Sequence, residues 1–426
     1  MININNKQQC CGCGACVQRC PKHSISLLGD NEGFQYPHVD TETCIECGLC
    51  EKVCPIQNPY EKRKPLQVLA AINKDEKIRM ESSSGGVFTL LAEQIIREGG
   101  VVFGARFDEE WQVTLDYTET TEGLASFRGS KYVQARTAET YKQCEQFLKE
   151  GRKVLFTGSP CQIAGLHHYL QKEYTNLITC DFSCHGVPSP EVWRKYLNAV
   201  IMAFQRTATD VIFRNNDNGW KRFNVKIEST QGGKVVFLTS FYKKNQYMNA
   251  FLNDIIMRPS CYNCSAKEGR SMSDITIADY WGVDMIHSEI DDDKGISLVL
   301  ANSDKGKSIL SSLDYFYIET DASFAIRQNK GLYQKQINIP KKRDFFFNQI
   351  LVQSDIIALM EECTPKKNIS QIHKVKHKIV NYIKTLIGWQ NLSSFGEYKI
   401  VQIKFRDKSD SWRKYQIQIK LYNART

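Results

Sequence analysis

The chain has 426 residues, of which 16 are cysteine, 42% are hydrophobic and 24% are charged. This length and composition exclude a collagen-like, disordered or low-complexity protein and allow two or three hydrophobic cores. The amino terminus lacks a basic segment followed by an apolar one, and the longest apolar run, 296–301, is too short to cross a bilayer, so we expect a soluble, cytoplasmic protein. In that reducing compartment, many cysteines favour metal binding over disulfides.

The net charge of +9 is concentrated at the C-terminal end. Residues 341–426 contain 17 lysines and arginines and 7 acidic residues. The first 340 residues contain 39 lysines and arginines and 40 acidic residues. Basic charge also suits nucleic acid, but the chain has no aromatic platform and no groove-reading motif. We therefore expect no nucleic-acid partner.

Residues 1–58 hold nine cysteines and too little apolar material for a hydrophobic core. The pattern C-x2-C-x2-C-x3-C-P occurs twice in them, 34 residues apart, with two short strands expected between the copies. Bacterial two-cluster ferredoxins have this run, and the fourth cysteine of each copy binds the other cluster. One 4Fe–4S cluster is thus predicted on Cys10, Cys13, Cys16 and Cys54, and the other on Cys44, Cys47, Cys50 and Cys20.

A pair of zinc knuckles is the alternative for this segment, because C-x2-C also suits zinc. Four cysteines at this spacing, twice, each followed by proline, exceed what a tetrahedral zinc site requires. Cys11 falls outside the pattern and is interpreted as a bystander or as a thiol beside the ligands.

A charged linker over 58–67 leads into alternating strands and helices. Strands are predicted at 66–72, 101–107, 111–118, 153–158, 176–184, 222–230, 234–240, 273–282 and 296–303, the pair at 222–240 as a hairpin. Helices are predicted within 82–100, 138–151, 160–170, 343–363 and 373–389, and a second hairpin within 397–422. This alternation favours a mixed sheet flanked by helices.

Four cysteines of the body follow predicted strands or form a short pair. Cys161 follows a buried strand at a helix start, Cys184 follows another strand, and Cys261 and Cys264 form C-x2-C. Strand ends meet at one edge of a sheet, so these thiols are candidates for one site. Zinc is the usual interpretation of a single C-x2-C, and Cys161 beside His185 is the alternative of a thiol nucleophile. The remaining cysteines, Cys144, Cys180 and Cys363, are expected to be small buried hydrophobes.

The ordered motifs SSSGGVFTLL, GSKYVQAR, FTGSPCQIAG, CHGVPSP, FRNNDNGW, RPSCYNC and SDITIADYWG resemble the family of beta subunits of coenzyme F420 (deazaflavin) hydrogenases and dehydrogenases. The resemblance covers roughly residues 1–325. It implies a ferredoxin module, a mixed-sheet α/β flavin-binding body and a basic C-terminal extension. The predicted domains are a two-cluster ferredoxin domain (1–60), an N-terminal flavin domain (66–150), a domain with a third cluster (151–325) and the extension (326–426).

By this resemblance, Cys161, Cys184, Cys261 and Cys264 hold a third 4Fe–4S cluster beside FAD. Hydroxyls and free N–H groups at a helix start suit a pyrophosphate, and a plain helix cap is the alternative for this motif. A lysine suits a phosphate or flavin N1, and a solvated surface lysine is the alternative there. Asp279 and Trp281 are interpreted as ordering the loop beside the C-x2-C pair, or as structural residues. The candidate FAD-binding residues are Ser83, Ser84, Gly85, Gly86, Lys131, Tyr132, Thr157, Gly158 and Ser159.

The implied function is that of an iron–sulfur flavoprotein oxidoreductase. It passes electrons between a hydride carrier or organic substrate, FAD and the clusters, with a redox protein or small hydride donor as partner. The alternative is a non-catalytic electron-relay subunit of a partner enzyme, for which surface-polysaccharide synthesis is one setting. A zinc-binding interaction protein is a third. No catalytic acid or base is assigned.

The segment 373–389 places apolar residues among four lysines, which is typical of an amphipathic helix on an anionic membrane surface. A helix packed on the body with a solvated basic face is the alternative. We predict that the full chain sediments with anionic vesicles, that salt weakens this, and that deleting 371–426 abolishes it, since each basic residue contributes about 1 kcal/mol near such a surface. Indifference of the full chain to vesicles contradicts the hypothesis.

Overall fold

The structure is a computed structural model, and it describes residues 1–203, 207–231, 234–365, 401–406 and 416–421. Its contacts divide the chain into two compact units, residues 1–365 and residues 366–426. In the second unit, β14 (Val401–Arg406) pairs antiparallel with β15 (Gln416–Leu421), which confirms the predicted C-terminal hairpin. The helix predicted at 373–389 lies outside the described residues.

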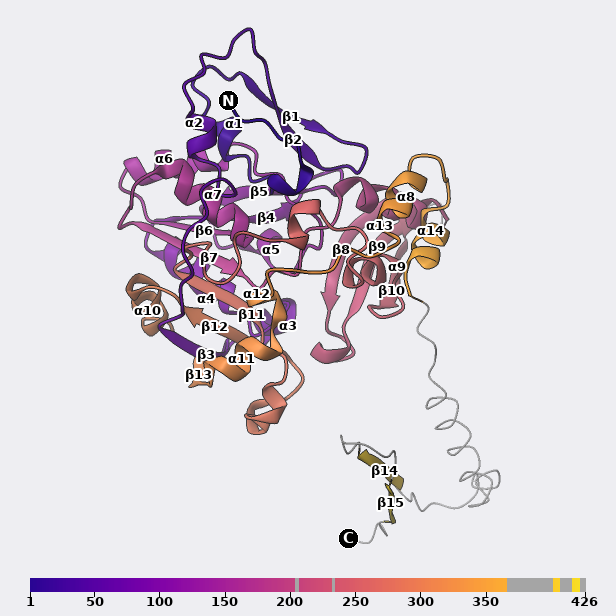
Figure 1. Cartoon of the computed structure of the whole chain (residues 1–426). Helices are drawn as coiled ribbons and strands as arrows, with labels where there is room; N and C mark the ends of the chain where they lie inside the picture. Colours follow the sequence, from indigo (N-terminus) through magenta and orange to yellow (C-terminus); the bar gives the residue numbers. More distant parts are fainter. Residues whose placement is uncertain (204–206, 232–233, 366–400, 407–415, 422–426) are drawn as a thin grey trace. The chain divides into compact units, whose positions relative to one another are not determined.

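An eight-stranded sheet, in the order β13-β3-β12-β11-β7-β6-β4-β5, forms the centre of the first unit (Figure 1). The pairs β4–β6, β6–β7 and β7–β11 are parallel, and the other pairs are antiparallel, so the sheet is mixed, as predicted. The strands are β3 (Gln67–Ile72), β4 (Val101–Phe107), β5 (Val113–Thr118), β6 (Val154–Gly158), β7 (Leu177–Phe182), β11 (Ile275–Asp279), β12 (Ser297–Ala301) and β13 (Phe316–Glu319).

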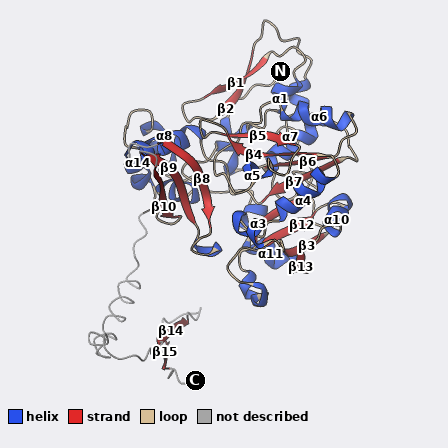
Figure 2. Ribbon diagram, turned by 180° about the vertical axis from the view of Figure 1, so that it is seen from behind, coloured by secondary structure: helices blue, strands red, loops and turns tan. Residues whose placement is uncertain are grey.

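Helices cover both faces of this sheet because its strands are apolar on both sides (Figure 2). On β6, Val154 and Phe156 point to one face and Leu155 to the other. The first face packs on α6 (Thr140–Lys149) and α7 (Pro160–Leu170). The second packs on α4 (Val87–Arg97), α5 (Leu124–Phe127) and α10 (Asp304–Ser311). The predicted helices at 82–100, 138–151 and 160–170 are thus confirmed.

Shorter helices complete this part of the fold. They are α3 (Glu76–Glu81), α11 (Ala322–Gln328) and α12 (Lys330–Tyr333), and the last two pack beside β3 and β12. Among the described residues, no helix is long and apolar enough to cross a membrane.

A second hydrophobic core lies in the long insertion between β7 and β11. It contains α8 (Pro190–Ala203), α9 (Gln246–Leu252) and a three-stranded antiparallel sheet of β8 (Thr207–Asn215), β9 (Asn224–Gln231) and β10 (Lys234–Phe241). The pairing of β9 with β10 confirms the predicted hairpin. Two helices, α13 (Arg343–Gln349) and α14 (Ile356–Cys363), replace the single helical stretch predicted at 343–363 and bury Phe346 and Leu359 in this core.

The first 60 residues form a small module of α1 (Ala15–Arg19), α2 (Leu49–Lys52) and the antiparallel pair β1 (Ile25–Gly29) and β2 (Gln35–Val39). The two strands lie between the cysteine runs, as predicted. Cysteines replace most of the apolar core that such a short segment would otherwise need. Val53 and several buried cysteines share a hydrophobic cluster with α6 and α7, so the module is packed onto the body (Figure 1).

Gly165 of α7 makes the close approach of this module possible. A Cβ atom at this position would lie 2.9 Å from the Cβ and 3.0 Å from the Sγ of Cys13. Such contacts are shorter than side chains tolerate in a packed interior. The absence of a side chain on α7 therefore allows the first cysteine loop to lie against the helix.

We predict that Gly165→Val destabilises the chain by about 1–3 kcal/mol through overpacking and reduces iron retention, because Cys13 must move away from α7. Thermal unfolding and iron assay measure both effects. Gly29→Val is the matched control, since nothing lies within 4 Å of a Cβ built at Gly29. Equal behaviour of the two variants contradicts the role assigned to Gly165.

Candidate functional site

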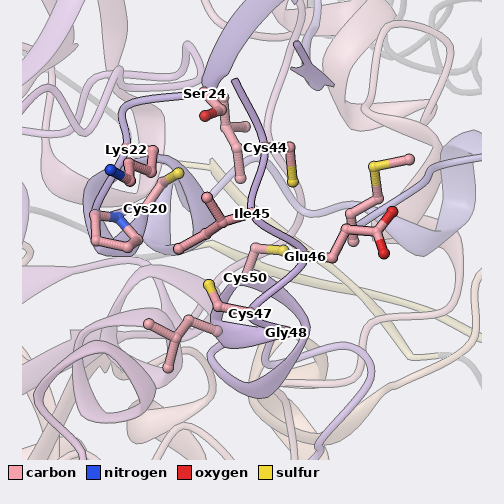
Figure 3. Close-up of a pocket in the computed structure, with 13 residues that line it drawn as sticks. Cys20, Lys22, Ser24, Cys44, Ile45, Glu46, Cys47, Gly48 and Cys50 are labelled. Carbon is pink, nitrogen blue, oxygen red and sulfur yellow. The ribbon is translucent and has the colours of Figure 1, made fainter. Parts of the chain in front are cut away.

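The four predicted ligands of the second ferredoxin cluster line one pocket (Figure 3). Cys20 follows α1, Cys44 and Cys47 precede α2, and Cys50 lies on α2. Gly48 between them has φ +71°, a conformation that suits glycine and turns the chain into the helix. The backbone N–H of Ile2 donates to Cys50 Sγ at 3.2 Å. Ile45 and Cys47 are exposed, so this pocket opens at the surface.

The four predicted ligands of the first cluster lie deeper. Cys13, Cys16 and Cys54 are buried, and Cys10 is half-buried. Burial, followed by the neighbouring Cys10 and Cys54 thiolates, raises the pKa of Cys16 to about 12. The sulfurs are thus near enough to repel one another as thiolates, which is the arrangement that bound iron favours.

The structure also brings together the four body cysteines. Cys161 lies in the first turn of α7, directly after β6. Cys184 lies just after β7, the strand that pairs with β6. Burial and then Cys264 raise the pKa of Cys261 to about 12. Burial and then Cys261 raise the pKa of Cys184 well above its ordinary value, with smaller contributions from Cys161 and Cys264. The four body thiols are therefore near enough for the charge of one to affect the pKa of another.

Among the described residues, no group of three or more His, Cys, Asp or Glu side chains is arranged so that it could hold a metal ion. For the nucleophile alternative, the described contacts give Cys161 no base. His185 Nε2 lies 2.7 Å from Asp254 Oδ1, whereas Cys161 Sγ lies 3.3 Å from Ser159 Oγ.

Cys11, which the spacing leaves aside, lies between two of these sets. Its thiol interacts with the thiols of Cys13 and Cys161. The Cys13 contact, with burial, raises the pKa of Cys11 well above the ordinary value, although the Cys161 contact opposes this. The first ferredoxin set and the body set therefore approach each other at Cys11. Nothing in the local spacing could reveal a contact with a residue so far away along the chain.

The SSSGG loop before α4 is held by the protein itself. Ser83 Oγ accepts hydrogen bonds from Ser130 N at 2.7 Å and Ser130 Oγ at 2.8 Å. Ser84 Oγ donates to Ile296 O at 2.7 Å, and Gly85 N donates to Ser297 Oγ at 3.0 Å. The serine hydroxyls thus fix the loop, and Gly86, with φ +80°, directs the chain into α4.

Lys131 lies on the loop that Ser83 holds. Its Nζ donates to Arg128 O at 2.9 Å and to Gly129 O at 3.2 Å, and burial lowers its pKa to about 7 although the Asp210 charge opposes this. No carboxylate forms an ion pair with it among the described residues. A partly buried ammonium held only by carbonyls is a suitable partner for a bound anion.

Arg214 is a site residue that the sequence reasoning missed. Its guanidinium is buried, pairs with Asp279 Oδ2 at 2.6 Å, donates to Ser83 O at 3.0 Å and reaches the Tyr132 hydroxyl at 3.5 Å. Trp220 Nε1 also donates to Ser83 O, and its ring stacks on Trp281 at 4.8 Å. The FRNNDNGW motif carries both Arg214 and Trp220, and that motif was the signal that could have found them.

Several polar atoms beside the Ser83 loop have no hydrogen-bond partner in the described part of the chain. They are Arg214 Nε, Asn215 Oδ1 and Asn216 Oδ1, all buried. Buried polar atoms normally have a partner, so Arg214 Nε is available to donate to a bound group and the two amide oxygens are available to accept from one.

Thr157, Gly158 and Ser159 occupy a different place from the other candidates. Thr157 Oγ1 donates to Phe103 O at 2.7 Å, and Ser159 forms a capping box with Gln162 at the start of α7. Ser159 Oγ also lies 3.3 Å from Cys161 Sγ. Their predicted role toward FAD therefore has less structural support than that of Lys131.

Comparison with known proteins gives three matches to family models. Two of the models describe the beta chain of coenzyme F420 hydrogenase/dehydrogenase: residues 68–142 match its N-terminal part, and residues 151–323 match its C-terminal part. Residues 9–58 match the 4Fe-4S dicluster domain. The two beta-chain models together cover more than half of the chain.

Individual relatives are more distant. The chain is 24% identical to the F component of the F(420)H(2) dehydrogenase of Methanosarcina mazei over 36% of this chain and 46% of that protein, so it spans about half of that relative. It is 22% identical to an uncharacterized protein of Methanocaldococcus jannaschii over 79% of this chain and 94% of the other. A structure of the F420-reducing [NiFe] hydrogenase complex from Methanosarcina barkeri gives 16% identity and a TM-score of 0.43, covering 64% of this chain and 90% of that one.

We predict about twelve iron and about twelve acid-labile sulfide per chain after anaerobic reconstitution, from three cubane clusters. Cys261→Ser should lose about four iron, and Cys144→Ser, a buried cysteine outside the three sets, should lose none. Iron and sulfide assays measure both. Zinc in place of iron contradicts the cluster assignment, and about eight iron in the unaltered chain contradicts the third cluster alone.

Proposed function

Because the chain belongs to the family of coenzyme F420 hydrogenase/dehydrogenase beta subunits, as its motifs predicted, we propose that it is an iron–sulfur flavoprotein oxidoreductase. It exchanges electrons between a hydride carrier or organic substrate, FAD and its 4Fe–4S clusters. In this proposal two clusters bind to the ferredoxin-type domain over residues 9–58, a third binds to the body cysteines, and FAD binds at the polar loop around Ser83.

The observation that carries this proposal is the proximity of the Ser83 site to the body cysteines. Arg214, which donates to Ser83 O, pairs with Asp279 at the end of β11. On the adjacent strand β7, Phe182 aligns with Ile277 of β11, and Cys184 follows two residues later. The Ser83 loop and the body cysteines thus meet at the carboxyl ends of β7 and β11, and α/β proteins bind cofactors at such strand ends.

When bound, FAD supplies hydride chemistry with its substrate and one-electron exchange with the clusters. The chain's own residues bind and orient it. Protonated Lys131 places positive charge beside the Ser83 loop, which favours an anionic or reduced cofactor, while Arg214, paired with Asp279, holds the loop in place. The Trp281 ring, stacked on the buried Trp220 ring, provides an apolar wall. The cysteines of the three sets hold the iron.

An electron-relay subunit without its own substrate site is the second candidate. The packing of residues 1–58 against α6 and α7 favours it, because a ferredoxin domain fixed on the body suits transfer to or from another protein. Anaerobic donor screening separates the two: hydride-donor-dependent reduction of a dye by the chain alone supports the oxidoreductase, and activity only with a partner supports the relay.

We predict that FAD copurifies anaerobically and that Lys131→Met weakens its binding about tenfold or more, because a charge-assisted hydrogen bond contributes about 1.5–3 kcal/mol. Flavin release and fluorescence titration measure this. Lys149→Met on the exposed face of α6 is the matched control. A chain without flavin, or equal affinity of both variants, contradicts the proposed site.

We also predict that FAD binding weakens as pH rises from 7 to 9. The free protein has Lys131 with a pKa of about 7, and an anionic ligand prefers the protonated form, so above pH 7 binding must include uptake of a proton. Lys131→Met should remove this dependence. A pH-independent affinity in the unaltered chain contradicts the role of Lys131.

A further inference from the structure

Arg258 joins the body to the first cysteine loop. Its side chain is fully buried, and its Nε donates to Cys10 O at 2.8 Å. Its Nη1 donates to Gln134 Oε1 at 3.1 Å, and its Nη2 donates to Gln35 O at 2.9 Å and to Cys10 Sγ at 3.5 Å. One guanidinium therefore contacts two parts of the ferredoxin module and a predicted cluster ligand.

These contacts include no carboxylate, which distinguishes Arg258 from other buried arginines. Arg79, Arg214 and Arg343 each pair with an aspartate or glutamate at 2.6 Å. Within the described ranges, Arg258 forms no such ion pair, and the ionisable side chains around its guanidinium are the Cys10 thiol, 3.5 Å from Nη2, and Tyr36, whose ring lies 4.4 Å away. A buried charge is costly unless an opposite charge offsets it, so the counter-charge belongs to the cysteine sites.

Arg258 is also tied to the body cysteines. Its backbone N–H donates to Val187 O at 3.0 Å, and its carbonyl accepts from Cys261 N at 2.9 Å. Val187 N in turn donates to Cys261 Sγ at 3.4 Å. The side chain thus extends from the loop of one cysteine set to the loop of another.

The surroundings keep water away from the guanidinium. The Tyr36 ring lies 4.4 Å from it and the Phe34 ring 5.4 Å. Gly12 provides the space, since a Cβ there would lie 2.9 Å from Arg258 Nη1. In such a site a charge acts more strongly than it would in water.

We propose that Arg258 is a positioning residue shared by the first ferredoxin cluster and the body cluster, fixing their separation and supplying the cation that stabilises the reduced first cluster. This inference rests on the proposed function. The step it serves is the transfer of one electron, in which one cluster is oxidised and the other reduced with no bond formed or broken. The second ferredoxin cluster, in the pocket that opens at the surface, is then the outer end of the path.

Potentials of 4Fe–4S clusters depend on nearby charge and on hydrogen bonds to sulfur. A cation favours the reduced, more negative state, so its removal lowers the potential. We expect Arg258→Met, in the full reconstituted chain, to shift the reduction equilibrium of one cluster at least tenfold toward the oxidised form, which is about 59 mV for a one-electron couple. Arg258→Lys, which keeps the charge, should restore most of this shift.

The experiment is an EPR-monitored redox titration with dithionite as the reductant. Arg343→Met is the matched control, because Arg343 is also buried and reaches the same module, but its charge is paired with Glu32. It should loosen the module without moving any cluster potential. Equal shifts in the Arg258 and Arg343 variants overturn the inference, since they would arise from docking alone.

If Arg258→Met loses its clusters, the iron content of Arg258→Lys is the deciding measurement. Clusters retained in Arg258→Lys support the role of the charge, and clusters lost in both variants overturn it. Unchanged potentials in an iron-replete Arg258→Met protein also overturn the inference while leaving the proposed function intact. Absence of cluster signals in the unaltered chain is instead a failure of the proposed function.

Discussion

The burial of cysteine sulfurs beside one another is the constraint on which the rest of the structure depends. Burial and mutual repulsion raise the pKa of Cys16 and Cys261 to about 12, so these thiols become thiolates only when a bound cation stabilises the charge. The ferredoxin loops also share a hydrophobic cluster with α6 and α7. Cluster binding and packing of the first 60 residues are therefore coupled, as in other proteins whose metal supplies part of the folding free energy.

The sheet gives these loops a rigid base. Cys161 and Cys184 follow adjacent parallel strands, and Asp279 ends the next strand. Arg214 connects Asp279 with the Ser83 loop, and Arg258 connects Cys261 with Cys10. Two buried arginines with different counter-charges thus mark two neighbouring parts of the site: one paired with a carboxylate at the proposed flavin, the other facing thiols between the proposed clusters.

Local patterns predicted most strands of the central sheet and the helices at 82–100, 138–151 and 160–170, because burial repeats at short intervals along strands and helices. They missed α8, α9, α10, β8 and β13. The ferredoxin spacing likewise predicts its ligands from one short segment, and four of them line one pocket. Arg258 and Cys11 could not be found in this way. Their partners are distant in the sequence, so only the fold brings Arg258 to Cys10 or Cys11 to Cys161. The split of 343–363 into α13 and α14 was missed for a similar reason, since both halves are apolar and pack on one core.

The central claim is that one chain contains both a two-electron and several one-electron centres. A coulometric titration of the anaerobically purified chain tests it most directly, because it counts electrons without assigning any spectrum. Three clusters and one FAD should take up roughly five electrons per chain, one for each cluster and two for the flavin. Uptake of only about three electrons, with three clusters' worth of iron present, would contradict a flavin in this protein.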